Sequence, residues 1–420
     1  MFCCKSSANS DEPDWRLDPA REQTVPLTAF ESSAQLTSST SVGTVTYYDG
    51  DAYAAKAFLK ARVAAIVEAN PWLGGLLRRK DGRGKLVFEP SNPHPLCFKE
   101  GTVPGLWANS RHIDRLQACH SDLSPFVVQK GYMLYASTAS PLFQVSLLTA
   151  TPLVRLPTSF AVVVTVTHII ADGHTFYTLY RMLDPSAKVA ALSPKRADDL
   201  EAKEDELVGG FRALQGYMPG MAMNYIFRPK REVIVYEADV GVVKANKELA
   251  AREGGVAYVS TNDLTTAAFF QAAEADLGIM AINLRSKLPA YSDDLAGNYE
   301  SCIWYTPKDV SPALIRKSLT PQPGYRRAAE PQTEYPGIST RLKGRISNCS
   351  SWTTFYGDVR LDGCTQTQHI PIFDFDEVAR CMDFCIIFRP TNERLGLVCG
   401  MHPKTRAAFE AELSGALKAV

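Results

Sequence analysis

The sequence lacks the excess of positive charge that binding to nucleic acid requires. Its 420 residues contain 45 Lys and Arg and 45 Asp and Glu, so the formal net charge is zero. Such a balance offers no extended electrostatic attraction to a polyanion. We therefore expect no nucleic acid among the partners of this protein.

Long apolar runs are also missing. The longest, residues 160–171, is interrupted by threonines and is much shorter than the roughly 20 residues that cross a bilayer. The opening residues MFCCKSSANSDEPD lack the apolar core of a secretory signal. We therefore expect no membrane span and a cytoplasmic protein. Cys3 and Cys4 form a candidate S-acylation site for peripheral membrane association, although two free thiols near a terminus are the simpler interpretation.

Metal and redox signatures are absent as well. The ten cysteines are scattered without a CxxC pair, which is typical of a reduced set of small hydrophobic side chains. No HExxH occurs, and the seven histidines do not cluster with carboxylates at ligand spacing. We expect no metal and no permanently bound cofactor.

Three further enzyme signatures are missing. No GxGxxG follows an expected strand, DGRGK lacks the spacing of a phosphate-binding P-loop, and no GxSxG nucleophile elbow occurs. These absences argue against dinucleotide-dependent enzymes, P-loop enzymes and the usual α/β serine hydrolases.

Strand-like and helix-like segments alternate without a strict βαβ rhythm, which predicts an α/β (α+β) protein. The length favours two domains. We divide the chain into a flexible N-terminus (1–24), a first half (25–194), a charged connector (195–230) and a second half (231–420).

Periodicity predicts the main elements of both halves. Leu59, Val63, Ile66 and Val67 share one face of a helix that begins near residue 51 and ends before Pro71. Further helices are expected at residues 173–183, 260–278 and 403–420. Strands are expected at residues 84–90, 142–150, 159–169, 232–240, 300–307 and 382–390.

The stretch VTVTHIIADGHTFY, residues 164–177, carries the strongest chemical signal. Imidazole titrates at about pH 6.5, so His168 at a strand end, facing a cavity, could activate a hydroxyl or an amine. Asp172 would be turned away from the ring and, if buried, would require a cation. Gly173 would relax the bend before the next helix. The alternative is a core histidine followed by a turn-forming Asp-Gly.

HIIADG resembles the HxxxDG signature of the BAHD superfamily of acyl-CoA-dependent transferases, which condensation domains and chloramphenicol acetyltransferase share. Other segments resemble BAHD motifs in the same order, so that the resemblance spans about residues 25–415. They are NPWLGGLLRRKDGRGKLVF, STNDLTTAAFFQA, INLRSKLP followed by LAGNYES, and SNCSSWTTF. The resemblance implies a divergent member with a two-domain chloramphenicol acetyltransferase-like fold. Each half would be a mixed sheet flanked by helices, with an active-site channel between the halves.

The resemblance also implies catalytic roles. His168 would deprotonate the acceptor, which attacks the acyl thioester. Asp172 would be structural and pair with Arg285, holding the turn that carries the ring. The indole N–H of Trp352 would stabilise the oxyanion, although plain core packing explains this residue equally well.

Two residues are expected on the acceptor side. Ser350 matches a hydroxyl that faces the acceptor in the family. Thr167 stands where condensation domains carry a second histidine, which argues against formation of peptide bonds.

Four residues are expected near coenzyme A. Gly297 and Asn298 fall where family members approach its tail. Thr261 and Asp263 are weaker candidates, since capping of a helix explains them equally well.

The chain departs from the family in its second signature, DFGWG. Residues 361–365 read LDGCT and keep only Gly363 in register. The resemblance implies a monomeric acyltransferase that uses acyl-CoA as co-substrate and a small alcohol or amine as acceptor, without a covalent acyl-enzyme. Two alternatives stay open: a transferase that makes neutral lipids or wax esters, and a non-catalytic relative that binds an acyl thioester or lipid.

Overall fold

The computed structural model describes most of the chain. The described residues are 15–39, 41–104, 106, 122–137, 139–151, 158–208, 218–227, 231–288, 290–320, 325, 327–328, 345–413 and 415–419. The candidate S-acylation site at Cys3 and Cys4 lies outside them.

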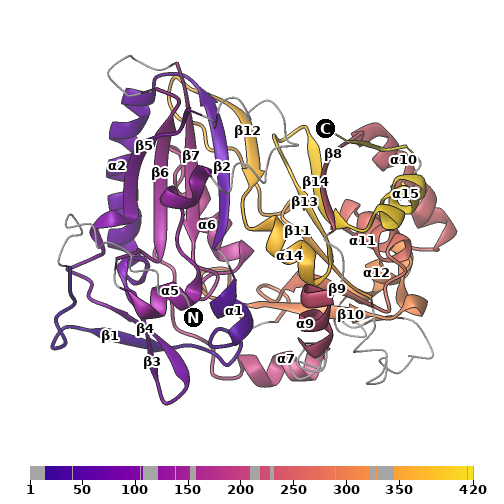
Figure 1. Cartoon of the computed structure of the whole chain (residues 1–420), viewed down its shortest axis with the longest axis horizontal. Coiled ribbons are helices and arrows are strands. Elements are labelled where there is room, and N and C mark those ends of the chain that lie inside the picture. The colour runs from indigo at the N-terminus through magenta and orange to yellow at the C-terminus, as the bar shows by residue number, and fades with distance from the viewer. Residues whose placement is uncertain are drawn as a thin grey trace.

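A mixed five-stranded sheet forms the first half, on the left of Figure 1. Its order is β12-β2-β7-β6-β5, with β5 and β6 parallel and the other neighbours antiparallel. The central strand β7 is buried from Phe160 to Val166, which accounts for its almost continuous run of apolar and threonine residues. The strands are β2 (Val42–Asp49), β5 (Phe98–Thr102), β6 (Phe143–Thr149), β7 (Ser159–Val166) and β12 (Thr365–Pro371).

A seven-stranded sheet forms the second half, on the right of Figure 1. Its order is β10-β9-β11-β13-β14-β8-β15, and β11 runs parallel to both of its neighbours. The strands are β8 (Glu232–Ala238), β9 (Leu277–Asn283), β10 (Glu300–Tyr305), β11 (Ile346–Ser351), β13 (Asp383–Phe388), β14 (Leu395–Met401) and β15 (Leu417–Ala419). A small antiparallel sheet flanks the first half and contains β1 (Gln23–Pro26), β4 (Arg83–Phe88) and β3 (Leu76–Lys80).

Helices cover both large sheets. In the first half, α2 packs against β5 and β6, and α6 packs against β2 and β7. In the second half, α11 packs against β11 and β13, with α10, α12 and α15 beside it. The helices are α1 (Ala34–Ser38), α2 (Ala52–Ala69), α5 (Gly131–Ala136), α6 (Gly173–Arg181), α7 (Leu200–Val208), α9 (Met218–Phe227), α10 (Val240–Glu253), α11 (Thr261–Ala272), α12 (Pro312–Ser318), α14 (Phe375–Cys381) and α15 (Pro403–Glu412).

The two halves share a hydrophobic core and a strand. One buried cluster joins residues of the first sheet, among them Val45 and Val163, to Phe384 and Val398 of the second. In addition, β12 comes from the second half of the sequence but pairs with β2 of the first sheet, as Figure 1 shows. The sequence boundary at residue 231 is therefore not a boundary in space.

Several local predictions are confirmed. Helix α2 begins after Asp51, whose carboxylate caps it, and ends at Asn70 before Pro71. All four residues predicted for its inner face are buried. The helix predicted at residues 260–278 starts as expected, with Ser260 in a capping box, but α11 ends at Ala272 and Leu277 begins β9. The helix predicted after His168 is α6.

The predicted flexible N-terminus needs correction where it is described. Leu17 is buried against Leu76 and Val87, and the indole N–H of Trp15 donates to the Asn92 side chain at 3.1 Å. Residues 15–24 therefore pack against the small sheet. The prediction was wrong because residues 15–24 are mostly polar, and the packing of the two apolar residues Trp15 and Leu17 could not be inferred from the sequence.

The charged connector, residues 195–230, is also more integrated than predicted. Helix α7 packs against β10, and Leu200 is 4 % exposed within the core of the second half. Arg196 is buried because it pairs with Glu31, at 2.8 Å between Nε and Oε1. Sequence alone does not reveal a partner so far away in the chain.

The C-terminal helix is shorter than predicted. Helix α15 ends at Glu412, and β15 then pairs antiparallel with β8 at the edge of the second sheet. Gly415 has φ of +75°, a conformation that ends helices and suits glycine. Amphipathic spacing cannot distinguish the last helical turn from a short edge strand.

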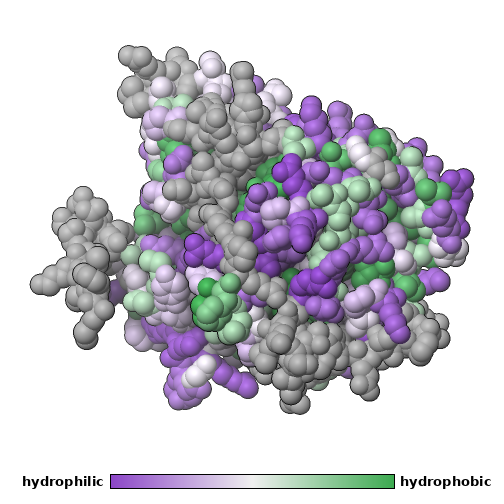
Figure 2. Space-filling view, turned by 45° about the vertical axis from the view of Figure 1, so that its right-hand side comes forward, coloured by the Kyte–Doolittle hydropathy of each residue, from purple (hydrophilic) through white to green (hydrophobic). Residues whose placement is uncertain are grey.

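The surface shows no single dominant apolar region in the view of Figure 2, where hydrophilic and hydrophobic side chains are interspersed. Within the described ranges, each helix is too short or too polar to span a lipid bilayer.

Candidate active site

The HxxxDG segment forms the turn between β7 and α6. Strand β7 ends at Val166, and His168 begins the turn with 26 % of its side chain exposed. The following residues Ile169, Ile170 and Ala171 are fully buried in the core of the first half. Their packing fixes the path of the turn, so the backbone at His168 has a defined position.

Asp172 closes this turn as the N-cap of α6. Its Oδ1 accepts from the backbone N–H of Thr175 at 2.9 Å, and its Oδ2 accepts from that of Tyr299 at 3.0 Å. Arg285 donates from Nη1 to the same Oδ2 at 2.6 Å. Both carboxylate oxygens are therefore occupied.

The Asp172–Arg285 ion pair is buried and joins the two halves. The side chains are 2 % and 0 % exposed, respectively. Arg285 also donates from Nη2 to the carbonyl of Gly297 and the hydroxyl of Thr175, each at 3.0 Å, and from Nε to the carbonyl of Leu295 at 2.8 Å. These bonds offset the cost of burying the charges.

The electrostatics agree with an ionised pair. Burial alone would raise the pKa of Asp172, but the Arg285 charge, its hydrogen bond and the backbone N–H of Thr175 lower that pKa below its ordinary value. The turn is thus held by a carboxylate that remains ionised at neutral pH.

A second buried ion pair supports the loop that faces the turn. Gly297 has φ of +127°, and the Arg196 guanidinium lies where a Cβ would stand, with Cζ only 2.6 Å away. Arg196 in turn pairs with Glu31, which is fully buried and accepts from the backbone N–H of Asn298 at 3.1 Å. Gly297 is therefore required by both backbone conformation and close packing.

Asn298 contacts the His168 ring directly. Its Oδ1 lies 3.1 Å from His168 Nδ1. Its Nδ2 faces three acceptors, namely the backbone carbonyls of His168 (2.8 Å) and Ile169 (3.3 Å) and Oε1 of Glu31 (3.2 Å). The amide orientation is therefore fixed, and its Oδ1 can only accept.

It follows that His168 Nδ1 carries the proton in the neutral ring. The lone pair is then on Nε2, the atom that would act as a base. Asn298 was predicted near coenzyme A, but it is 3 % exposed and its amide is consumed by these bonds. In the structure Asn298 and Gly297 hold the turn that carries His168, and their contact with coenzyme A stays a prediction.

Glu300 faces the other ring nitrogen. Its Oε1 lies 3.4 Å from His168 Nε2, and its side chain is 27 % exposed. Burial is the largest influence and raises the pKa of the Glu300 carboxyl above its ordinary value; Asp172 adds to this, and His168 and Arg285 offset it only in part. Sequence analysis missed Glu300, although it stands two residues after Asn298, a spacing that places both side chains on one face of an extended segment.

Trp352 and Ser350 come from the second half. The Trp352 ring packs edge-on against Tyr177 of α6, with centroids 6.1 Å apart, and is half-buried. Ser350 lies in β11 and is half-buried. Phe355 lies near the start of α6: a Cβ atom added to Gly173 would be 3.9 Å from its ring. The loop after β11 thus lies against the helix that follows the motif.

Two motif residues differ from expectation. Thr167 is 2 % exposed, so it is not available to an acceptor in this conformation. Gly173 occupies the first position of α6 and has an ordinary negative-φ backbone with room for a Cβ. The turn itself therefore does not require glycine at residue 173.

Thr261 and Asp263 lie at the start of α11. Asp263 is fully buried, completes the capping box with Ser260 and pairs with Arg316 at 2.8 Å. Its carboxylate therefore stabilises the helix and is not free to contact a ligand. Thr261, at the first helical position, is half-buried.

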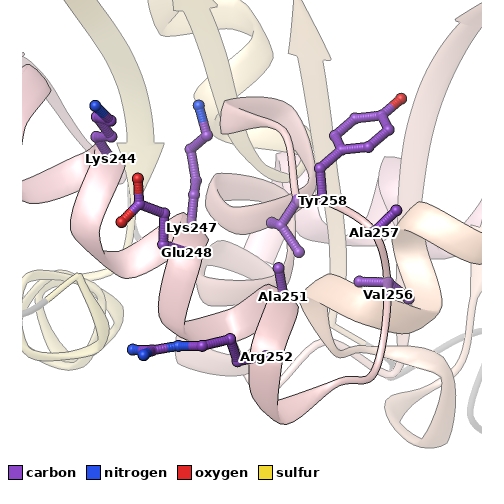
Figure 3. Close-up of a pocket in the computed structure, with 9 residues that line it drawn as sticks. Lys244, Lys247, Glu248, Ala251, Arg252, Val256, Ala257 and Tyr258 are labelled. Atoms are coloured by element: carbon purple, nitrogen blue, oxygen red, sulfur yellow. The ribbon is translucent and has the colours of Figure 1, made fainter.

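A hollow of about 660 Å³ opens beside the segment that leads into α11. Figure 3 shows its charged walls: Lys244, Lys247, Glu248 and Arg252 from α10, with Tyr258 across from them. Neither lysine forms an ion pair with another described residue. Tyr258 is 58 % exposed, and the Arg316 guanidinium lies 4.7 Å from its ring centroid. The hollow therefore has a net positive charge.

In the part of the chain that the structure describes, no group of three or more His, Cys, Asp or Glu side chains could hold a metal ion. The described cysteines are all free, and Cys349 and Cys385 lie side by side on β11 and β13 within the core. They act as small packing residues.

No protein-family model matches the chain, and no curated protein sequence matches it either. Solved structures do match over nearly its whole length.

TRI101 of F. sporotrichioides, solved with coenzyme A and T-2, is 11 % identical, with a TM-score of 0.61 over 94 % of this chain and 99 % of that one. Polyketide synthase associated protein 5 from Mycobacterium tuberculosis is 14 % identical, with a TM-score of 0.53 over 92 % and 96 % of the two chains. The first condensation domain of the calcium-dependent antibiotic synthetase, solved with a substrate analogue, is 13 % identical, with a TM-score of 0.54 over 94 % and 97 %.

These likenesses confirm the predicted fold. The chain adopts the two-domain chloramphenicol acetyltransferase-like fold. Because a fold of this kind can host more than one activity, the reaction must be argued from the site.

Proposed function

We propose that this protein transfers an acyl group from an acyl-CoA thioester to a hydroxyl or amine of a small acceptor, with His168 as general base. One observation carries the proposal. Asn298 fixes the tautomer of a ring that stands, partly exposed, where the two halves meet, so that the Nε2 lone pair is the reactive one. The solved structure of TRI101 with coenzyme A supports the choice of donor.

The reaction balances without a metal or a covalent acyl-enzyme. Nε2 takes the proton of the acceptor as its oxygen or nitrogen attacks the thioester carbonyl. A tetrahedral intermediate forms, and we assign its oxyanion to the indole N–H of Trp352. The C–S bond then breaks, and the imidazolium returns the proton to the thiolate of coenzyme A.

The decisive experiment is a screen for release of free coenzyme A. Acetyl-CoA and longer acyl-CoA donors would be offered with mixed alcohols and amines to the wild type and to His168→Ala. We expect the variant to lose about 10²–10⁴-fold in kcat/KM while keeping its melting temperature, the usual contribution of a general base. His402→Asn, which replaces the exposed cap of α15 by another capping side chain, is the matched histidine control. Full activity in His168→Ala would refute the mechanism.

The same screen separates the alternatives. A preference for long-chain alcohols and long donors would indicate a neutral-lipid or wax-ester transferase. Saturable binding of acyl-CoA without turnover of any acceptor would indicate the non-catalytic binding protein.

We also assign the nucleotide end of the donor to the hollow on α10. Lys244, Lys247 and Arg252 outnumber Glu248 there, which suits the phosphates of coenzyme A. The double variant Lys244→Glu/Lys247→Glu should weaken coenzyme A binding about tenfold at low salt, and the difference should shrink as salt screens these partly exposed charges. Lys60→Glu, on the exposed face of α2, is the control. Equal affinity of the double variant and the control would place the nucleotide elsewhere.

A further inference from the structure

His168 has two polar neighbours, one for each ring nitrogen. Asn298 occupies Nδ1 at 3.1 Å, and Glu300 lies 3.4 Å from Nε2. The side chains of His168 and Glu300 are 26 % and 27 % exposed, so both are only partly shielded from water. A carboxyl group therefore lies beside the nitrogen to which the proposed function assigns proton transfer.

The carboxylate of the HxxxDG motif cannot fill this position. Asp172 Oδ1 is taken by the N–H of Thr175, and Oδ2 by Arg285 and the N–H of Tyr299. Among the described residues, Glu300 is the carboxylate at ion-pair distance from the His168 ring. The two carboxylates of the site therefore have different positions: Asp172 holds the turn, and Glu300 faces the His168 ring.

We propose that Glu300 is a positioning residue for His168, whose carboxylate lies beside Nε2 and stabilises the imidazolium formed during acyl transfer. This inference rests on the proposed function. It extends that function by naming an acidic partner for the base that the HxxxDG motif does not contain.

The proton balance is unchanged by this role. The proton moves from the acceptor to Nε2 and then to the sulfur of coenzyme A, while Glu300 remains ionised and exchanges no proton. A negative charge about 4 Å from an imidazole favours the protonated ring, so Nε2 becomes a better proton acceptor.

The charged groups around Glu300 come from three elements. His168 follows β7, Asp172 caps α6, and Arg285 follows β9. Asp172 and Arg285 neutralise one another at 2.6 Å, so the charge of His168 is the one left to balance Glu300.

The test compares Glu300→Gln, Glu300→Asp and the control Glu253→Gln, an exposed residue at the end of α10. Full-length protein with isotope-labelled histidine would be titrated by NMR, with the His168 signal assigned from its loss in His168→Gln. In parallel, kcat/KM would be measured against pH for each variant.

In Glu300→Gln the negative charge is lost, so we expect the midpoint of the His168 titration to fall by about one pH unit or more. The acid limb of kcat/KM should move to lower pH by the same amount. The plateau kcat should fall about tenfold, because the base is weaker, while the KM for acyl-CoA stays unchanged. Glu300→Asp should lie between wild type and Glu300→Gln, and Glu253→Gln should match wild type.

An unchanged His168 titration in Glu300→Gln overturns the inference. So does loss of transfer in Glu300→Gln combined with activity in His168→Ala, because Glu300 would then itself be the base. If Glu300→Gln does not fold, as judged by circular dichroism, the titration of Glu300→Asp decides by the same criterion. If the wild type transfers no acyl group at all, the proposed function fails, whereas the NMR titration still tests the pairing.

Discussion

Nη1 of Arg285 and Oδ2 of Asp172 lie 2.6 Å apart, in a fully buried contact that joins the two halves of the molecule. The arginine follows β9 of the second sheet, and the aspartate caps α6 of the first half. Because the same guanidinium binds the carbonyls of Gly297 and Leu295, it fixes the loop that carries Asn298 and Glu300. The ion pair therefore positions both groups that contact the His168 ring.

Replacing Asp172 by Asn should destabilise the protein strongly. The change leaves the Arg285 charge buried without a counter-ion, which typically costs about 3–5 kcal/mol. Urea unfolding at neutral pH would measure the loss in free energy of unfolding. Glu274→Gln, which breaks the exposed pair with Arg345, should change that free energy little. A small effect of Asp172→Asn would show that the pair is dispensable.

Replacing Asn298 by Ala should impair the proposed reaction more than the fold. Without its Oδ1, the Nδ1 proton of His168 has no fixed acceptor, so part of the population carries the proton on Nε2 and cannot act as a base. We expect kcat to fall about 10–100-fold, as is typical when a residue that orients a functional side chain is lost. Asn224→Ala is the matched control, since Asn224 is a buried asparagine of α9 that donates to the carbonyl of Cys381 at 3.1 Å. Equal losses of activity in both variants would argue against a role in orienting the ring.

The sequence predicted those parts of the fold that depend on local signals. The apolar spacing from Leu59 to Val67 and the helix starts expected near residues 51 and 260 each correspond to an element in the structure. The order of the motifs predicted the two-domain fold. Elements set by distant contacts were missed, such as the edge strand β15, which exists because β8 offers it an open edge.

In the site, too, residues within local motifs could be predicted, whereas residues whose partners are distant in the chain were missed. His168, Asp172 and Arg285 could be picked out because each stands in a motif, and the structure brings them together with Asn298. Glu300 was not picked out, because the residue that it faces, His168, lies 132 residues away in the chain. Glu31 was missed for the same reason, since its partner Arg196 lies in a segment whose charges suggested a solvated connector.

Replacing Gly297 by Ala should destabilise the loop behind the site. Its φ of +127° is rarely adopted by residues with a Cβ, and the added atom would stand 2.6 Å from Arg196 Cζ. The guanidinium would have to move from Glu31, so we expect a loss of roughly 2–4 kcal/mol in the free energy of unfolding, from backbone strain and a disturbed ion pair. Gly173→Ala is the informative comparison, because a Cβ there meets only the Phe355 ring at 3.9 Å. Its stability should stay close to that of the wild type, and equal losses in both variants would contradict the distinction drawn between the two glycines.

Acid should destabilise the protein through His369, a buried histidine outside the HxxxDG motif. His369 lies in β12, fully buried, with Nδ1 2.9 Å from the Thr46 hydroxyl and Nε2 3.1 Å from the Tyr177 hydroxyl. Burial lowers the pKa of its ring to about 3, because no charge nearby compensates the cost of protonation. In the unfolded chain the ring has its ordinary pKa of about 6.5, so between these two values the unfolded state binds the extra proton.

The free energy of unfolding should therefore fall as the pH drops below about 6.5, by about 2 kcal/mol between pH 7.5 and pH 5 from this residue alone. His369→Gln should be less stable at pH 7.5, since its amide cannot satisfy both hydroxyls in the same geometry, but it should lose less stability on acidification. Urea unfolding of both proteins at the two pH values measures the difference, with His402→Asn as the exposed control. If the free energy of unfolding falls by the same amount in wild type and His369→Gln between pH 7.5 and pH 5, other groups cause the acid sensitivity. The lowered pKa of His369 would then contribute nothing measurable to it.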